Sequence, residues 1–226
     1  AIATRLSVQR NLRGLGWGWM KRPVHLGGMI AFCFLGCLLV YLPLWLSGLG
    51  AFNREMLARM VSWVEQEGAR GIAKGLVLLL VLTLGEELGW RGLLAPQLSR
   101  ITTFTTTSLV TGLVWALWHF PIVALQLAYF QTRVPLWYSL LCFTATVLGL
   151  SFFFTWVRLR SESLWPGVLL HGSCNCAQWG MTWLTHRTTV TDYVIFQYGA
   201  GFAVVVWILV GIFWRRLQAS LPDRAA

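Results

Sequence analysis

The stretch GLVLLLVLTLGEELGWRG, residues 75–92, decides which kind of fold this chain can adopt. Its first eleven residues contain nothing ionisable, and Glu86, Glu87 and Arg91 follow at its end. A helix that crosses a bilayer needs roughly 20 mostly apolar residues, and this stretch fits. A charged side chain in such a helix costs from about 2.5 to more than 10 kcal/mol. The stretch therefore predicts a membrane helix whose ionisable end has a function.

The composition of the whole chain supports a membrane protein. Of 226 residues, 57% are hydrophobic and 12% are charged, and the mean hydropathy is +0.64. Soluble domains average about 25% charged residues. We therefore predict an all-α, polytopic membrane helical bundle that forms a single integral membrane domain over residues 1–226. Apolar runs indicate about six transmembrane helices, at 27–50, 75–98, 105–130, 136–157, 164–185 and 193–214.

The distribution of Lys and Arg predicts the orientation, because cytoplasmic flanks carry the positive excess. We predict that the N- and C-termini both lie inside. The inner side then holds Arg5, Arg10, Arg13, Lys21, Arg22, Arg91, Arg100, Arg158, Arg160, Arg215, Arg216 and Arg224. The outer side holds Arg54, Arg59, Arg70, Lys74, Arg133 and Arg187, and its first loop also carries three acidic residues.

The net charge of +10 raises the question of a nucleic-acid partner. We attribute the charge instead to inner flanks that face anionic lipid. Segment 1–26 is basic and contains Trp17 and Trp19, as expected of an interfacial anchor. We therefore expect membrane lipid, and no nucleic acid, as a partner.

The beginning of the chain shows no evident cleavable signal peptide. The first apolar run starts near residue 27 and is long enough to span, so we interpret it as a retained helix. The compact, basic chain looks bacterial, and we expect it in the bacterial inner (cytoplasmic) membrane. Five cysteines lie in the predicted spans, where a free thiol usually packs as a small hydrophobe: Cys33, Cys37, Cys142, Cys174 and Cys176.

The two glutamates of the opening stretch differ in their expected surroundings. Glu87 and Arg91 are four residues apart, so they share one face of a helix and can pair. Glu86 points about 100° away around the helix and cannot use the same arginine equally well. Desolvation and a like-charged neighbour both favour a protonated carboxyl group, which suits a group that accepts a proton from water. An ordinary ion pair, with Glu86 reaching toward the cytoplasm, is the structural alternative.

Polar residues also interrupt two later apolar runs. His119 lies four residues after Trp115 on the same predicted helix face, and Pro121 is expected to disturb the backbone hydrogen bonding just beyond it. His171 and Asn175 are likewise four residues apart. Two such side chains can donate hydrogen bonds to one oxygen, as an oxyanion hole requires. A satisfied core histidine and polar contacts between helices are the structural alternatives. At compatible depths, these groups and Glu86 would form one cluster.

Together these residues resemble a known family. EELGWR, residues 86–91, matches an EExxxR motif; WALWH, residues 115–119, stands where that family has FxxxH; and HGSCN, residues 171–175, matches HxxxN. The motifs occur in family order within residues 80–180. The set is similar to the CPBP family, the CAAX prenyl protease and bacteriocin-processing (Abi) group of intramembrane proteases.

The resemblance implies a glutamate-type intramembrane endopeptidase, a hydrolase with no cofactor. Glu86 would be the general base that activates water, and His119 would assist it. His171 and Asn175 would stabilise the oxyanion, and Glu87 and Arg91 would position the site. Trp115 replaces the family's Phe at a structural or substrate-lining position. The expected substrate is a membrane-associated peptide or the C-terminal tail of an exported protein.

Two other functions stay open at this point. A zinc-dependent membrane peptidase could use Glu86, His119 and His171 as ligands with an open position for water, although HExxH is absent. A non-enzymatic membrane protein, such as a bacteriocin immunity protein, a scaffold or a proton-coupled carrier, could use the same buried groups for structure or proton relay. The set as a whole favours the metal-free protease.

Overall fold

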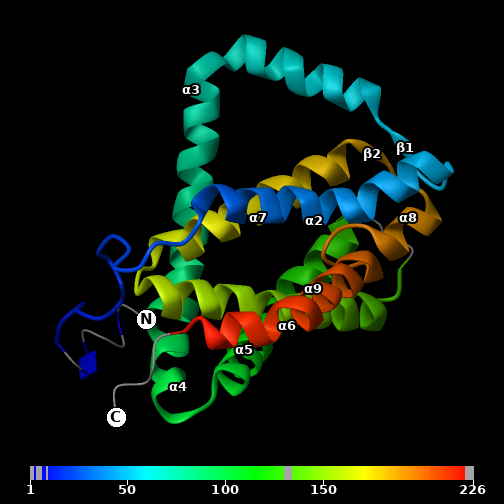
Figure 1. Cartoon of the computed structure of the whole chain (residues 1–226). Coiled ribbons are helices and arrows are strands. Elements are labelled where there is room, and N and C mark those ends of the chain that lie inside the picture. Colours follow the sequence, from blue (N-terminus) through cyan, green and yellow to red (C-terminus); the bar gives the residue numbers. More distant parts are fainter. Residues whose placement is uncertain (1–2, 4–6, 9, 130–133, 222–226) are drawn as a thin grey trace.

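Helices account for nearly all of the regular structure in the computed structural model, which describes residues 3, 7–8, 10–129 and 134–221 (Figure 1). The elements are α2 (Leu26–Ser47), β1 (Ala51–Phe52), α3 (Arg54–Glu87), the π-helix η2 (Leu88–Leu94), α4 (Ala95–Ile101), α5 (Phe104–Tyr129), α6 (Leu136–Ser161), α7 (Trp165–Trp183), β2 (Thr185–His186), α8 (Thr189–Val194) and α9 (Ala200–Ala219). β1 and β2 form one short antiparallel pair, with Ala51 opposite His186. The predicted all-α class is confirmed.

Five helical stretches of the described chain are long and apolar enough to cross a membrane: Leu26–Ser47, Arg54–Ile101, Phe104–Ala128, Leu136–Ser161 and Ala200–Ala219. The prediction of about six spans is corrected at α7. Its predicted run, 164–185, is helical as expected, but polar side chains such as His171 and Asn175 lower its hydropathy. The predicted run 193–214 also shifts, because α9 begins only at Ala200.

The connection predicted between the first two spans is itself helical. α3 begins at Arg54, where the Asn53 side chain accepts a hydrogen bond of 2.9 Å from the backbone N–H of Met56 and so caps the helix. At Gly68 the backbone takes φ 57° and ψ −155°, which bends the helix. Figure 1 shows the first half of α3 running outside the bundle and the second half returning to it. The connection between the predicted spans 27–50 and 75–98 is therefore mostly helical.

The core of the bundle forms around α6, most of whose side chains are buried. Small residues let neighbouring helices approach it closely. A Cβ at Gly112 of α5 would lie 2.8 Å from Ser151 Oγ, and one at Gly149 would lie 2.4 Å from a Val206 methyl group on α9. α5 continues through Pro121 as one helix. The packing of α5, α6 and α7 fixes the polar residues they carry.

The five cysteines are free thiols. Cys33, Cys37, Cys142 and Cys174 are buried in helix packing, as predicted. Cys176 differs, because it is exposed on α7. None of these thiols lies among the predicted catalytic groups.

The basic N-terminal segment packs against the turn between α6 and α7. The Lys21 N–H donates to the Ser161 carbonyl at 3.0 Å, and the Leu164 N–H donates to the Gly16 carbonyl at 2.8 Å. Leu15 is fully buried. These contacts hold the beginning of α7, and with it the polar residues of that helix, against the end of α3. The inside location of both termini stays a prediction, and Arg5, Arg133 and Arg224 lie outside the described residues.

Candidate active site

The two glutamates lie where an α-helix changes into a π-helix. α3 ends at Glu87, and residues Leu88–Leu94 form η2. In a π-helix the N–H groups bond to carbonyls five residues back, which widens the turn; such segments are frequent at functional sites. One turn earlier, the Thr83 hydroxyl donates to the Leu79 carbonyl at 2.8 Å. The backbone around the carboxylates is thus held locally.

Glu87 is fully buried and is held by two cationic or polar partners. Arg91 Nη1 donates to Glu87 Oε1 at 2.9 Å, which confirms the predicted pair. His171 Nδ1 lies 3.0 Å from the same oxygen. A Cβ at Gly167 would lie 3.0 Å from Glu87 Oε2, so glycine allows α7 to approach the carboxylate. The predicted support pair therefore also fixes the His171 ring.

Arg91 is also completely buried, and two aromatic rings cover its guanidinium group. The guanidinium carbon lies 4.3 Å from the Trp115 ring centroid and 4.2 Å from that of Phe154. Within the described chain, Arg91 Nε and Nη2 have no hydrogen-bond partner. A desolvated cation on a ring face gains about 2 kcal/mol or more. The rings and Glu87 together make this buried charge tolerable.

Arg158 is a supporting residue that sequence reasoning missed. It was assigned to the inner flank, yet it is buried on α6 and its Nε donates to the Arg91 carbonyl at 2.8 Å. This bond ties α6 to η2. Arg158 follows Phe154 by four residues and so shares a helix face with a ring that covers Arg91, a contact that only the structure shows.

Glu86 has more open surroundings than Glu87. Trp115 Nε1 donates to Glu86 Oε2 at 3.0 Å. His119 Nε2 lies 3.7 Å from the same oxygen, and the Glu86 and His119 side chains are 21% and 15% exposed. Glu86 is therefore near an imidazole and accessible from outside, whereas Glu87 is enclosed.

Trp115 links the two halves of the cluster. Its ring centroid lies 6.2 Å from that of His119 and 5.4 Å from that of His171. Its indole N–H is the donor to Glu86, and its ring covers Arg91. Phenylalanine has no such N–H, so the exchange of Phe for Trp adds a hydrogen bond that the sequence reading did not foresee.

The hydrogen bonds indicate which nitrogen of each histidine carries a proton. A backbone carbonyl only accepts, so His119 Nδ1, which lies 3.0 Å from the Trp115 carbonyl oxygen, donates. His171 Nδ1 likewise donates to the Glu87 carboxylate. In each neutral ring Nε2 keeps a lone pair, and it donates only when the ring is protonated. His119 and Glu86 can therefore share one proton.

Asn175 is the remaining predicted catalytic residue. It lies one turn beyond His171 on α7 and is half-buried.

The zinc alternative requires Glu86, His119 and His171 to bind one ion. His171 is hydrogen-bonded to Glu87, whereas His119 faces Glu86. In the part of the chain that the structure describes, no group of three or more His, Cys, Asp or Glu side chains is placed to hold a metal ion.

A known protein family is similar to the region that contains the cluster. Residues 69–177 match the family model described as type II CAAX prenyl endopeptidase, Rce1-like. This match covers slightly less than half of the chain and shows what its core is similar to. The matched residues contain all four predicted catalytic positions, from Glu86 to Asn175. With its apolar helices, the protein is an integral membrane protein.

One relative is similar to a part of this chain of about the same length. A CAAX prenyl protease 2 from Methanococcus maripaludis is 32% identical over 107 residues, which are 46% of this chain and 39% of that protein. The chain therefore covers well under half of that relative's length. No solved structure matches the chain.

Proposed function

We propose that this protein is an intramembrane endopeptidase in which Glu86 activates the attacking water. One observation carries the proposal. Glu86 Oε2 accepts from Trp115 and lies 3.7 Å from His119 Nε2, while the adjacent Glu87 is already paired with Arg91. Both neighbouring carboxylates lie near an imidazole, but only Glu86 is partly exposed, whereas Glu87 is fully buried.

The proposed reaction begins with a water molecule next to Glu86. Its oxygen attacks the carbonyl carbon of the scissile peptide bond, and its proton passes to the Glu86 carboxylate, with His119 able to take a share. The tetrahedral intermediate then collapses and the C–N bond breaks. The same proton moves to the departing amine nitrogen, so the products are a carboxylic acid and an amine and no acyl-enzyme forms.

His171 and Asn175 are the proposed donors to the oxyanion. Because His171 Nδ1 is hydrogen-bonded to Glu87, only Nε2 can face the substrate. Nε2 donates when the ring carries both protons, with the Nδ1–H group bonded to the Glu87 carboxylate. Donors of this kind, aimed at developing negative charge, act strongly where water is excluded. The Glu87–Arg91 pair would thus act on the reaction through His171.

We propose as substrate a membrane-associated peptide or the C-terminal tail of an exported protein, cleaved in the bacterial cytoplasmic membrane. The support is the position of Glu86 and His119, which lie on helical stretches that are long and apolar enough to span a bilayer. A peptide segment must therefore enter the membrane region, or border it, in order to reach Glu86.

The test is cleavage by the purified full chain in liposomes, with a mixture of short synthetic peptides and mass spectrometry of the products. We expect wild-type protein to cleave, and reactions in ¹⁸O-labelled water to place the label in the new carboxyl group. Glu86→Gln should be inactive, whereas Glu162→Gln, a carboxylate outside the cluster, should retain activity. Full activity in Glu86→Gln would refute the proposal.

Chelation separates the metal-free mechanism from the zinc alternative. We expect the cleavage rate to be unchanged after extensive treatment with a chelator, and the purified protein to contain no stoichiometric zinc. Loss of activity that added Zn²⁺ restores would contradict the mechanism and favour a metallopeptidase. The structure supports the metal-free form in that the two histidines contact different carboxylates.

A further inference from the structure

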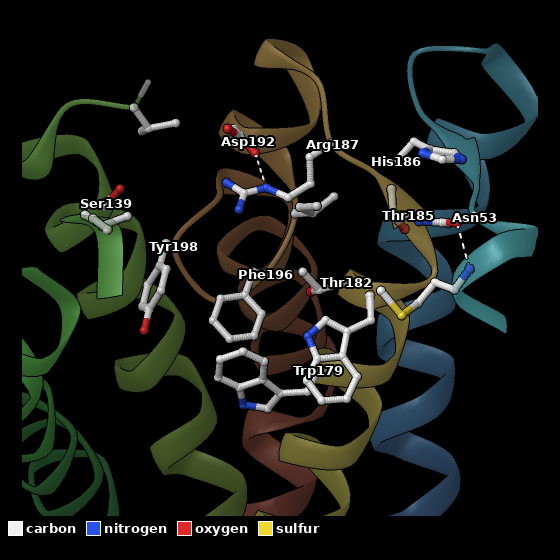
Figure 2. A pocket seen from close by; sticks show the side chains of 15 residues that line it. Asn53, Ser139, Trp179, Thr182, Thr185, His186, Arg187, Asp192, Phe196 and Tyr198 are labelled. Carbon is white, nitrogen blue, oxygen red and sulfur yellow. Dashed lines mark hydrogen bonds and ion pairs between the residues drawn. The ribbon is translucent and has the colours of Figure 1, made fainter. Parts of the chain in front are cut away.

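A second feature of the bundle is a pocket of about 310 Å³ near the β1–β2 pair. Figure 2 shows Trp179, Phe196 and Tyr198 around it, with Arg187 and Asp192 paired nearby. The ring centroids of Trp179 and Phe196 are 4.7 Å apart, and those of Phe196 and Tyr198 are 4.9 Å apart. The three rings form a continuous aromatic wall.

Many of the polar groups around the pocket already have partners within the protein. Arg187 Nε donates to Asp192 Oδ1 at 2.8 Å. The Thr182 hydroxyl bonds to the Gln178 carbonyl at 2.7 Å, and the Asn53 side chain caps α3. Other lining residues, among them Leu127, Val134 and Ile195, are apolar. The pocket is therefore suited to an apolar group rather than a charged one.

The pocket lies next to the proposed reaction site. The Phe143 ring centroid is 5.3 Å from that of His119 and 5.8 Å from that of Tyr198. His119 and Tyr198 are therefore at most about 11 Å apart, a distance that roughly three residues of an extended peptide cover at about 3.3 Å each. Phe143 is thus a neighbour of both the His119 imidazole and the pocket wall.

Two helices connect the two places. On α7, Trp179 follows His171 by eight residues, and on α5, Leu127 follows His119 by eight residues. Eight residues advance a helix by about 12 Å and return to the same broad face. Both helices therefore carry a proposed reaction group and, further along in the same direction, a residue that lines the pocket.

We infer that the pocket is a specificity subsite of the protease, and that it holds one large apolar or aromatic side chain of the peptide substrate. This side chain belongs to a residue within about three positions of the scissile bond, given about 3.3 Å per extended residue. The inference rests on the proposed endopeptidase function. We expect a peptide side chain as the occupant because α5 and α7 each carry a proposed reaction residue and, two turns further on, a residue that lines the pocket.

The first test compares cleavage-site profiles on peptides randomised at every position, with full-length protein in liposomes. Wild type should prefer a large apolar residue at one fixed position within about three residues of the cut. Trp179→Ala should lower kcat/KM for preferred peptides by about 10- to 100-fold and leave peptides with alanine there nearly unchanged, since apolar pockets discriminate on this scale. Trp137→Ala is the matched control, because Trp137 is exposed and does not line the pocket.

The outcomes separate the subsite from the proposed function. If wild type cleaves peptides and Trp179→Ala leaves the preference at every position unchanged, the subsite is refuted and the protease function stands. If wild type cleaves nothing, the protease function is refuted and the subsite with it. Any loss of folding in Trp179→Ala is detected as a lowered Tm.

A second measurement leaves the pocket intact. Glu86→Gln protein binds a photoreactive peptide that carries benzoylphenylalanine at the preferred position, and the cross-linked residues are mapped. We expect cross-links to pocket residues such as Met56, Leu127 and Tyr198. Cross-links that lie only outside the pocket, or competition by added phospholipid without any by unlabelled peptide, would overturn the inference.

Discussion

Two sides of one small cluster carry adjacent glutamates in unlike surroundings. On the first side, Glu86 accepts a hydrogen bond from the Trp115 indole N–H and faces His119. The side chains of Glu86 and His119 are both partly exposed. On the second side, Glu87 is fully buried between Arg91 and His171. We name these the reaction side (Glu86, His119) and the support side (Glu87, Arg91, His171).

The difference shows how one sequence motif divides its work. A proton acceptor needs access to water and a poorly satisfied carboxylate, and only Glu86 has both. A buried ion pair needs good geometry and further contacts, because desolvation of two charges costs several kcal/mol each. Glu87 and Arg91 meet this need through His171, two aromatic rings and the Arg158 bond to the Arg91 carbonyl.

The largest expected loss of activity follows from a change on the reaction side. His119→Gln removes the imidazole and keeps a polar side chain of similar length. We expect kcat to fall by about 10²- to 10⁴-fold, the usual contribution of a general acid or base. Tm should stay close to that of wild type. A strongly lowered Tm in His119→Gln, with the remaining folded protein cleaving at the wild-type rate, would contradict the assignment of His119 to the reaction side.

On the support side the main effect should be on stability. Arg91→Ala leaves the Glu87 carboxylate buried without its cation, and loss of one partner of a buried pair costs about 3–5 kcal/mol. Denaturation in detergent micelles should show this as a marked fall in Tm. Arg100→Ala is the control, since Arg100 is an exposed arginine on the neighbouring helix α4. Equal Tm values for the two variants would show that Glu87 does not depend on Arg91.

A change next to the support side should reduce the rate moderately. Asn175→Ala removes one proposed oxyanion donor, and loss of such a donor lowers kcat by about 100-fold or somewhat more. We expect KM to change little, because the interaction strengthens only in the transition state. If steady-state kinetics show a raised KM at unchanged kcat, Asn175 binds substrate instead of stabilising the oxyanion.

The smallest effect is expected at an exposed ion pair outside the cluster. Lys21 Nζ donates to Glu162 at 2.9 Å, and this hydrogen bond lowers the pKa of Glu162 below its ordinary value of 4.5. The pair's contribution is therefore present above about pH 4.5 and is lost as the pH falls through the lowered pKa. Because the Glu162 side chain is 39% exposed, Glu162→Gln should cost at most about 0.5 kcal/mol near neutral pH.

The expected cost of Glu162→Gln can be compared with the cost of breaking the buried Glu87–Arg91 pair. Thermal denaturation of Glu162→Gln and wild type at pH 7 and at pH 3.5 should give a small difference that shrinks on acidification. A loss comparable to that of Arg91→Ala would mean that burial is not what separates the support side from an ordinary surface pair.

The sequence predicted much of this arrangement because a membrane restricts the choices. Apolar runs predicted the positions of α2, α5 and α6 closely, and the spacing of Glu87 and Arg91 predicted their ion pair. The kink at Gly68 and the helical first half of α3 were missed, because charged residues there suggested a loop. Arg158 was missed because one sequence cannot distinguish a flanking arginine from a buried one.

The contacts between helices were the least predictable part of the site. Their four-residue spacing suggested that His171 and Asn175 can donate to one oxygen, whereas the hydrogen bond from His171 to Glu87 was not predicted. The π-helix η2 has no signal in the residue pattern that we used. One of its carbonyls, that of Arg91, accepts a hydrogen bond from Arg158 on α6.

The central claim is that Glu86 reacts and Glu87 supports, and paired measurements on Glu86→Gln and Glu87→Gln test it most directly. For each variant, purified in the same liposomes, Tm and the cleavage rate of one peptide are measured together. We predict that Glu86→Gln is inactive at the wild-type Tm, whereas Glu87→Gln has a clearly lower Tm. Wild-type cleavage by Glu86→Gln, or an unchanged Tm in Glu87→Gln, would contradict the account.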